Sequence, residues 1–295
     1  GVLYTSLIIS GYIDMQIIND PRELQAVCLP WRFSSLATAL VPTMGYLHAG
    51  HESLISKARQ DAAKVIVSLF VNPSQFGPDE DLAAYPRDFE RDAATAERLG
   101  ADILFAPEPS AMYDAEHATW VEVPGMAGTL CGLSRPVHFR GVCTIVAKLF
   151  MLTLPTYAYF GQKDWQQLAI LRRMARDLNI PVTLVGCPTV REKSGLALSS
   201  RNAYLTPKKY DSAAHLHGGL CLAKSLVAEG ETDTTKLDTA VRAYWAATMP
   251  LGDVEYLCFV DPDSLAALDA VTGPALVAAA VRLGRARLID NLLLR

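Results

Sequence analysis

Two histidines, His48 and His51, lie three residues apart in the segment 42–51, which reads Pro-Thr-Met-Gly-Tyr-Leu-His-Ala-Gly-His. The apolar run before them, 36–41, predicts a buried strand, and the run after them, 52–61, has helical spacing. The histidines therefore lie where a strand passes into a helix. Backbone N–H groups at a helix N-terminus, together with two imidazoles, suit a polyphosphate, to which the rings can donate as charge builds up in a transition state.

Other interpretations of this pair are open. Two histidines with this spacing can bind a metal, although no third ligand is evident nearby, and either ring can simply bond a backbone carbonyl. Gly45 and Gly50 allow tight turns and close approach of the backbone to a ligand, and the strand-to-helix context favours nucleotide binding. The segment resembles the HIGH motif of the nucleotidylyltransferase superfamily, which also includes class I aminoacyl-tRNA synthetases.

Three further polar segments follow predicted strands. Asn72 and Gln75 carry neutral donors and acceptors that suit the hydroxyls and carboxylate of a small substrate, although Asn72-Pro73 is also typical of a turn. Lys163 offers a point charge to phosphate, and Asp164 is equally a candidate N-cap. The loop 191–202 has hydroxyls and a guanidinium that can close over a diphosphate, or it is an interdomain linker. Its place after the last predicted strand favours the first interpretation.

Strand and helix patterns alternate between residues 36 and 190, which predicts an α/β fold with a Rossmann-like parallel sheet. In such a sheet the ligand lies outside the carboxyl ends of the strands, where all four polar segments fall. Strands are expected at 36–41, 64–70, 102–105, 157–160 and 182–187, and helices at 51–61, 88–99, 141–152 and 164–177.

A smaller C-terminal α+β domain is expected after Thr189, because the pattern there changes. We expect one domain over 15–189, which binds the nucleotide, and a lid domain over 190–295. The smaller domain is predicted to have helices at 207–229 and 234–248 and strands near 254–260, 275–282 and 286–290.

The composition excludes several classes of protein. The chain has 295 residues and a formal net charge of −4, which gives no basic field for nucleic acid. No apolar run is long enough to span a membrane. The six cysteines are scattered without a C-x-x-C pair, which favours reduced thiols in a cytoplasmic protein. Residues 1–14 have no positively charged n-region, so we expect no signal peptide and a native start at Met15.

The order of six segments is more specific than any one of them. Segment 42–51 is followed by Phe-Val-Asn-Pro-Ser-Gln-Phe at 70–76, Tyr-Pro-Arg at 85–87, His-Phe-Arg-Gly-Val at 138–142, Phe-Gly-Gln-Lys-Asp-Trp-Gln-Gln-Leu at 160–168, and 188–205, which ends in Ser-Ser-Arg-Asn-Ala-Tyr-Leu. This series closely resembles the pantoate–β-alanine ligases, also called pantothenate synthetases. The resemblance extends from about residue 16 to Asp290 and Asn291.

The resemblance implies a cytoplasmic, homodimeric ligase that uses ATP with Mg²⁺ and needs neither nucleic acid nor a membrane. Pantoate is adenylated, and β-alanine then attacks the pantoyl adenylate to give pantothenate and AMP. The catalytic residues would be His48, Lys163 and His51, with His51 as the proton donor. Pantoate and β-alanine would be bound by Asn72, Gln75 and Gln167. ATP would be bound by Met44, Gly45, Tyr46, Leu47, His48, Ala49, Gly50, His51, Gly161, Gln162, Lys163, Asp164, Val190, Leu198, Ser199, Ser200 and Arg201.

Two positions depart from this family pattern. Gln162 stands where many members have Glu, and Leu198 stands where many have Met. Neither change removes a phosphate donor. Two other functions share part of the pattern: a nucleotidylyltransferase that joins AMP or CMP to a phosphorylated metabolite, and a nucleotide-binding module without activity. The first does not require the neutral polar pocket, and the second does not require so many polar segments at strand ends.

Overall fold

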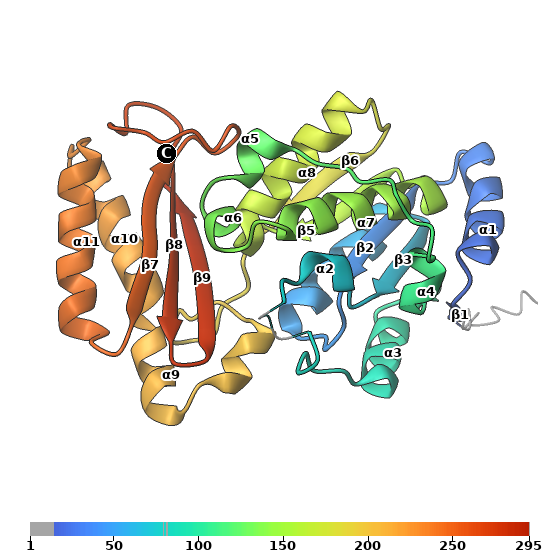
Figure 1. Cartoon of the computed structure of the whole chain (residues 1–295), viewed down its shortest axis with the longest axis horizontal. Helices are drawn as coiled ribbons and strands as arrows, with labels where there is room; N and C mark the ends of the chain where they lie inside the picture. The colour runs from blue at the N-terminus through green and yellow to red at the C-terminus, as the bar shows by residue number, and fades with distance from the viewer. Residues whose placement is uncertain (1–14, 79, 81, 295) are drawn as a thin grey trace, which may run out of the picture.

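The computed structural model describes residues 15–78, 80 and 82–294, so the expectations for residues 1–14 lie outside the described part of the chain. Within that part, six parallel strands form one sheet in the order β1-β4-β3-β2-β5-β6 (Figure 1). Every strand predicted between residues 36 and 190 is present. The strands are β1 (Gln16–Ile18), β2 (Thr38–Thr43), β3 (Lys64–Leu69), β4 (Ile103–Phe105), β5 (Tyr157–Gly161) and β6 (Thr183–Cys187).

The order of these strands reverses at β2, which pairs with β3 on one side and with β5 on the other. Such a switch point opens a crevice at the carboxyl ends of the two central strands. The segment with the two histidines follows β2, and the segment with Lys163 follows β5. The topology therefore brings together two motifs that lie more than a hundred residues apart in the sequence.

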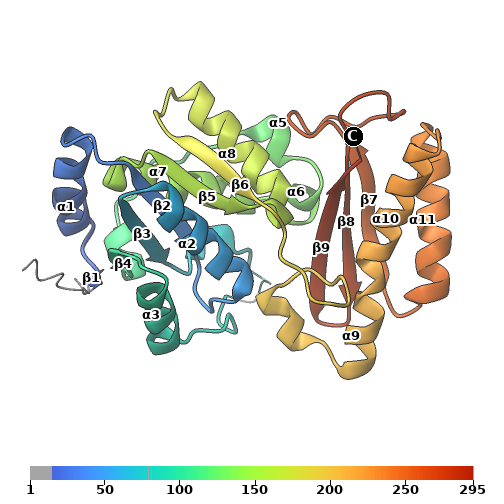
Figure 2. The ribbon, with the colours of Figure 1, turned by 180° about the vertical axis from the view of Figure 1, so that it is seen from behind.

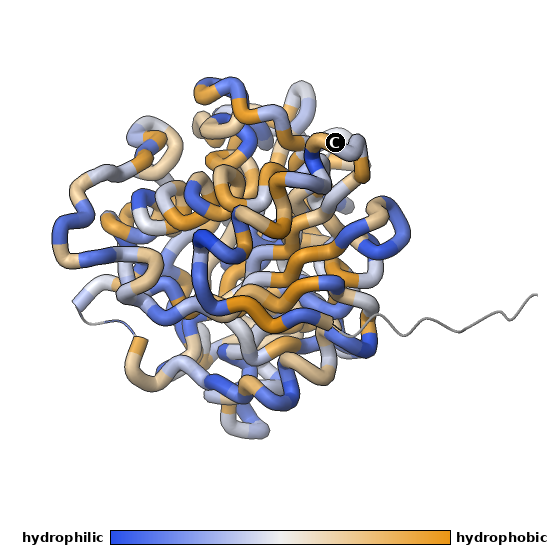
Figure 3. Tube along the Cα trace, turned by 90° about the vertical axis from the view of Figure 1, so that its right-hand side faces the viewer, coloured by the Kyte–Doolittle hydropathy of each residue, from blue (hydrophilic) through white to orange (hydrophobic). Residues whose placement is uncertain are grey.

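Helices cover both faces of this sheet. One face packs against residues of α1 (Pro21–Phe33), α7 (His138–Thr153) and α8 (Trp165–Asp177), and the other against α2 (Ala49–Asp61) and α3 (Phe89–Arg98). Both faces of β2 and β3 are therefore buried, which explains their continuous apolar runs. Hydrophobic segments of the chain accordingly gather toward the middle of the molecule, and hydrophilic segments are common along its outer loops (Figure 3). The shorter elements are α4 (Pro109–Met112), α5 (Pro124–Ala127), α6 (Cys131–Ser134) and the 3₁₀ turns η1 (Pro73–Gln75), η2 (Gln162–Asp164) and η3 (Ser200–Tyr204).

A second, antiparallel sheet follows, in the order β7-β8-β9. Along β8, Val277, Ala279 and Val281 join the core under the C-terminal helices, whereas Leu276 and Ala278 join the core of the large sheet. This alternation is typical of a strand buried on both faces. The C-terminal elements are α9 (Pro207–Ala213), α10 (His215–Ala228), α11 (Thr234–Thr248), β7 (Asp253–Val260), β8 (Leu276–Leu283) and β9 (Ala286–Leu293). From behind, the chain is seen to pass from β6 toward α9 beside this sheet (Figure 2).

Three local predictions differ from the structure. The sequence pattern did not reveal β1 and α1: β1 has three residues, and α1 buries only Leu24 and Cys28 and contains Pro30. The single helix expected over 207–229 is instead the pair α9 and α10, which meet at Ala214. Helix α7 begins at His138 rather than at Gly141.

Candidate active site

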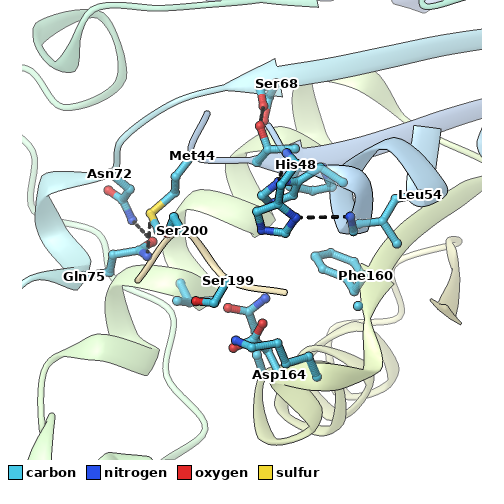
Figure 4. Close-up of a pocket in the computed structure, with 18 of the residues that line it drawn as sticks. Met44, His48, Leu54, Ser68, Asn72, Gln75, Phe160, Asp164, Ser199 and Ser200 are labelled. Atoms are coloured by element: carbon cyan, nitrogen blue, oxygen red, sulfur yellow. Dashed lines mark hydrogen bonds between the residues drawn. The ribbon is translucent and has the colours of Figure 1, made fainter. Parts of the chain in front are cut away.

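One cavity of about 240 Å³ opens at the carboxyl ends of β2 and β5. His48, His51, Lys163 and Ser199 all line it, as do Asn72 and Gln75 from the neutral polar segment and Gln167 from the segment after β5. Figure 4 shows His48, Ser199, Asn72 and Gln75 around this space. The four polar segments therefore surround a single space, as the sequence predicts. The remaining predicted site residues on this cavity are Met44, Gly50, Gly161, Asp164, Val190, Leu198, Ser200 and Arg201.

The turn between β2 and α2 is held from outside by α3. Gly45 and Tyr46 both have left-handed backbone conformations, with φ of 83° and 52°. The carboxylate of Asp92 accepts the N–H groups of Tyr46 at 2.6 Å and Leu47 at 2.7 Å, and Arg91 donates to the Leu47 carbonyl. Two consecutive residues of α3 thus satisfy both the donors and the acceptor of the turn. Sequence reasoning missed both, because α3 has no motif to mark them.

Backbone contacts set the tautomers of the two histidines. His48 is the N-cap of α2 and its Nδ1 accepts the Gly50 N–H at 3.1 Å, while Nδ1 of His51 accepts the His48 N–H at 3.4 Å. A ring nitrogen that accepts carries no proton, so each neutral ring has its proton on Nε2. Both rings can therefore donate through Nε2–H to an anion in the cavity.

The environment keeps both rings neutral. Burial, followed by the positive charge of Lys163, lowers the pKa of His48. Burial, followed by the influence of His48, lowers the pKa of His51 to about 3. The ring centroids are 4.1 Å apart, which further disfavours a charge on both. Neutral donors beside a lysine can stabilise developing negative charge without a proton transfer.

Asn72 and Gln75 form the neutral part of the cavity, and both are buried, with 1% and 6% of their surfaces exposed. The Asn72 amide donates to Gln75 Oε1 and to the Gly141 carbonyl, both at 3.1 Å. Among the described residues, the hydrogen-bond partner of the Gln75 amide nitrogen is the sulfur of Met44, at 3.0 Å. A thioether is a weak acceptor, so the Gln75 N–H can exchange this contact for a hydrogen bond to a substrate oxygen at little cost in free energy.

His138 supports this pocket from α7. Its Nε2 lies 3.2 Å from Arg135 Nη1, and its Nδ1 lies 3.0 Å from the Gln75 carbonyl. Since a guanidinium only donates, Nε2 must accept and Nδ1–H must donate to Gln75. Burial, followed by the charge of Arg135, lowers the pKa of His138 to about 4. Arg135 also pairs with Glu80, so these residues are internally satisfied supports rather than open anion sites.

The segment after β5 gives three side chains to the cavity. Lys163 and Asp164 lie in η2, and Gln167 lies in the first turn of α8. Asp164 stands at the N-cap position of α8 but makes no side-chain capping hydrogen bond, so the capping interpretation is not supported. The neighbouring Gln166 has a different role, because it is buried and bonds the Cys131 N–H and the carbonyls of Met126 and Thr129.

The segment 191–202, which we call the flap, closes one side of the cavity. Arg191 and Ala197 form an antiparallel bridge, so the flap begins as a small hairpin. The Ser199 hydroxyl accepts the Arg201 N–H at 3.3 Å and so caps η3. Ser199 and Arg201 also line a second cavity of about 520 Å³ between the two sheets, to which Lys163 and Gln167 contribute as well.

Five predicted ATP residues do not line the first cavity: Gly45, Tyr46, Leu47, Ala49 and Gln162. Leu47 is buried in the core beneath α2, and the ring of Tyr46 lies under the guanidinium of Arg91, 5.0 Å from its carbon. Ala49 begins α2. The Gln162 amide donates to the Gly186 carbonyl of β6 at 3.3 Å. These residues shape the backbone around the cavity rather than offer side chains to it.

The described residues contain no cluster of three or more His, Cys, Asp or Glu side chains that could hold a metal ion. Within these residues, the two histidines therefore have no third His, Cys, Asp or Glu ligand beside them. Among the described residues lining the first cavity, Asp164 is the one carboxylate. None of the helices in the described ranges is long and apolar enough to cross a membrane.

Comparison with known proteins identifies relatives along almost the whole chain. The family model described as "Pantoate-beta-alanine ligase" matches residues 16–293. The pantothenate synthetase of Nitratidesulfovibrio vulgaris strain DP4 is 60% identical over 280 residues, which are 95% of this chain and 99% of the relative. That of Oleidesulfovibrio alaskensis is 61% identical over 280 residues, covering 95% of this chain and all of the relative (100%).

Solved structures agree with this match. The crystal structure of pantothenate synthetase from Thermus thermophilus has a TM-score of 0.90 at 43% identity, covering 95% of this chain and 99% of that one. Pantoate-beta-alanine ligase from Francisella tularensis, complexed with "Beta-gamma ATP and Beta-alanine", has a TM-score of 0.76 at 30% identity, covering 95% and 98%. On the strength of the family match and these identities, the chain belongs to the pantoate-beta-alanine ligase family.

Proposed function

We propose that this protein is a ligase that joins pantoate to β-alanine with ATP, giving pantothenate, AMP and diphosphate through a pantoyl adenylate. The family and the relatives support this reaction. The observation in the structure that carries it is the single cavity on which His48, His51 and Lys163 meet the neutral amides of Asn72 and Gln75. A cationic and N–H-rich side suits a triphosphate, and a neutral side suits a hydroxy acid.

In the first step, a carboxylate oxygen of pantoate attacks the α-phosphorus of ATP, and diphosphate leaves. Two anions must be held together, so positioning and charge stabilisation are the main demands on the protein. His48 and His51 would donate Nε2–H to the phosphate oxygens, and Lys163 would neutralise charge at the α-phosphate. Ser199, Ser200 and Arg201 would hold the leaving diphosphate from the flap.

In the second step, the amine of β-alanine attacks the acyl carbon of the adenylate, and AMP leaves. The mixed anhydride is already an activated acyl donor, so the reaction needs no nucleophile from the protein. The cavity between the sheets shares Lys163 and Gln167 with the first cavity. The amine would approach the acyl carbon through this second cavity. Gln75 and Gln167 would hold the pantoyl hydroxyls during the attack.

The proposal includes Mg²⁺ as part of the nucleotide substrate. Mg²⁺ commonly keeps several waters and binds through phosphates and one or two carboxylates, and Asp164 offers one carboxylate at the cavity. The other Gly-rich and backbone positions of segment 42–51 would bind the nucleotide. We further propose a cytoplasmic homodimer, with residues 15–189 as the domain that binds substrates and 190–295 as its lid. The six cysteines, none of them in a disulfide, fit a reducing compartment.

Isotope exchange between diphosphate and ATP tests this function directly. The exchange should require pantoate but not β-alanine, and addition of β-alanine should release AMP. Exchange without pantoate, or ADP as the product, would contradict the proposal. A panel of phosphorylated metabolites in the same assay tests the nucleotidylyltransferase alternative, which predicts exchange with one of them and none with pantoate.

A further inference from the structure

Two consecutive residues of β9 reach out of the small sheet to two different parts of the candidate site. Asp290 and Asn291 are both buried, with 3% and 8% of their surfaces exposed, and both line the cavity between the sheets. Adjacent residues of a strand point to opposite faces, so one pair of side chains can bridge two elements. The two reaction steps proposed above use neither residue.

Asn291 holds the turn that carries Lys163. Its side-chain amide donates to the Gln162 carbonyl at 3.0 Å and to the Lys163 carbonyl at 2.8 Å. An amide has two N–H donors, so Asn291 commits its whole donor capacity to this one turn. The orientation of the Lys163 backbone, and with it the direction in which its ammonium leaves the turn, therefore depends on β9.

Asp290 holds the base of the flap. Its two oxygens accept both terminal nitrogens of Arg191, at 2.6 and 2.8 Å, and Oδ1 also accepts the Asn291 N–H at 2.8 Å. The same guanidinium donates to the Gly195 carbonyl at 3.2 Å and so closes the flap hairpin. A bidentate pair fixes orientation as well as distance. Eight residues after Arg191, the flap presents Ser199 to the cavity.

The charge of Asp290 persists despite its burial. Burial alone would raise the pKa of this carboxyl, but contacts with His217 and Arg191 keep the pKa below its usual value. His217 Nδ1 lies 3.5 Å from Oδ2, whereas the Asn291 backbone N–H bonds the other oxygen. The ion pair between Asp290 and Arg191 is therefore present at neutral pH.

We infer that Asp290 and Asn291 are positioning residues through which the small sheet fixes Lys163 and the flap relative to each other. The inference rests on the proposed function, since it assigns these residues to phosphate transfer. Neither side chain is placed against a substrate. Asn291 acts through Lys163, and Asp290 acts through Arg191.

A double-mutant cycle tests the role of Asn291. In the exchange assay, Asn291→Leu should lower kcat about 10-fold or more, as expected when a catalytic group loses its orientation, while the KM for pantoate stays within about 2-fold. In the Lys163→Ala background, Asn291→Leu should cause no further loss, because residues that act as a unit are not additive. An equal loss in both backgrounds overturns the inference.

The control is Val281→Ala, which removes a buried side chain of β8 that lies in the core of the small sheet. It should lower the urea concentration at the midpoint of unfolding, as expected for a small cavity in the core, and leave kcat unchanged. If it lowers kcat as far as Asn291→Leu does, general loosening of the small sheet explains the effect and the inference fails.

Limited proteolysis tests Asp290 without relying on catalysis. Asp290→Asn should speed tryptic cleavage after Arg191 and Lys193 about 10-fold relative to Val281→Ala, because the base of the flap is released. Unchanged cleavage would refute the role of Asp290 in holding the flap. This readout also separates the two proposals. If cleavage is faster in a protein that shows no pantoate-dependent exchange, Asp290 does hold the flap but the proposed function is wrong.

Discussion

Asp92 accepts the backbone N–H of Leu47 at 2.7 Å from a helix that lies 45 residues further along the chain. The second oxygen of the same carboxylate accepts the N–H of Tyr46, so one buried charge satisfies two successive donors of the turn before His48. Burial raises the pKa of Asp92, and the two N–H contacts oppose that rise. The geometry of the histidine segment therefore depends on a side chain outside it.

Replacing Asp92 with Asn should destabilise this turn. An amide has one oxygen, so one of the two N–H groups loses its acceptor and faces an NH₂ group instead. We expect a loss of about 1–3 kcal/mol in the free energy of unfolding, measured by urea denaturation, and slower diphosphate–ATP exchange. Asp88→Asn is the matched control, because Asn serves equally well as the N-cap of α3. Equal stability of the two variants would show that the carboxylate of Asp92 does not hold the turn.

The histidine segment and Asp92, which holds its turn, differ in how far the sequence predicts them. The turn itself is encoded locally, by Gly45 and by the change from strand to helix pattern, so its position and even its neighbours in space followed from periodicity and topology. Asp92 carries no such signal. It lies within an ordinary amphipathic helix, and only the packing of α3 beside α2 brings its carboxylate to the turn.

Both histidines should be required for adenylation. His48→Ala and His51→Ala should each slow pantoate-dependent exchange by about 100-fold or more, the loss expected for a donor to the transition state. His48→Asn separates two roles, because Asn can cap α2 but has no imidazole Nε2–H. It should be as stable as the wild type and still slow. An effect confined to the KM for β-alanine would mean that the rings act in the second step.

Gly141 should tolerate no side chain. A Cβ at this position would lie 2.5 Å from the Ser74 carbonyl oxygen and 2.6 Å from the Gln75 backbone nitrogen, and neither backbone atom can rotate away. Gly141→Ala should therefore displace η1, raise the KM for pantoate at least about 10-fold and lower the free energy of unfolding by about 1–3 kcal/mol.

The control for this substitution is Gly125→Ala. Gly125 also lies in a helix, but a Cβ there meets nothing within 4 Å. This variant should have the stability and the pantoate KM of the wild type. If Gly141→Ala also had wild-type stability and pantoate KM, η1 would have to move freely. The close contact between η1 and α7 would then not constrain the pocket.

Long-range contacts of this kind explain most of what the sequence did not predict. Asn72 and Gln75 are recognisable as a polar pair after a strand, but their contact with Gly141 depends on how α7 packs. Asp290 and Asn291 mark the end of the family resemblance, yet their partners are Arg191 and the turn of Lys163, which only the tertiary structure brings near. By contrast, α11 follows from local pattern alone and spans Thr234–Thr248, the range that its sequence predicts.

His138 should make stability depend on pH. In the unfolded chain its pKa is about 6.5, whereas in the folded protein it is lowered to about 4. Between these values the unfolded state binds a proton that the folded state does not, so stability is full above about pH 6.5 and falls as the pH decreases. Each pH unit in this window costs about 1.4 kcal/mol for one such group.

In His138→Asn, the amide nitrogen can replace Nδ1 as the donor to Gln75, but it does not titrate. Urea denaturation at about pH 7 and about pH 5 should therefore show that the wild type loses about 2 kcal/mol more than this variant, since the two pH values span about 1.5 units of the window. Equal losses would mean that the ring becomes protonated in the folded protein, which would require Arg135 to move away from Nε2.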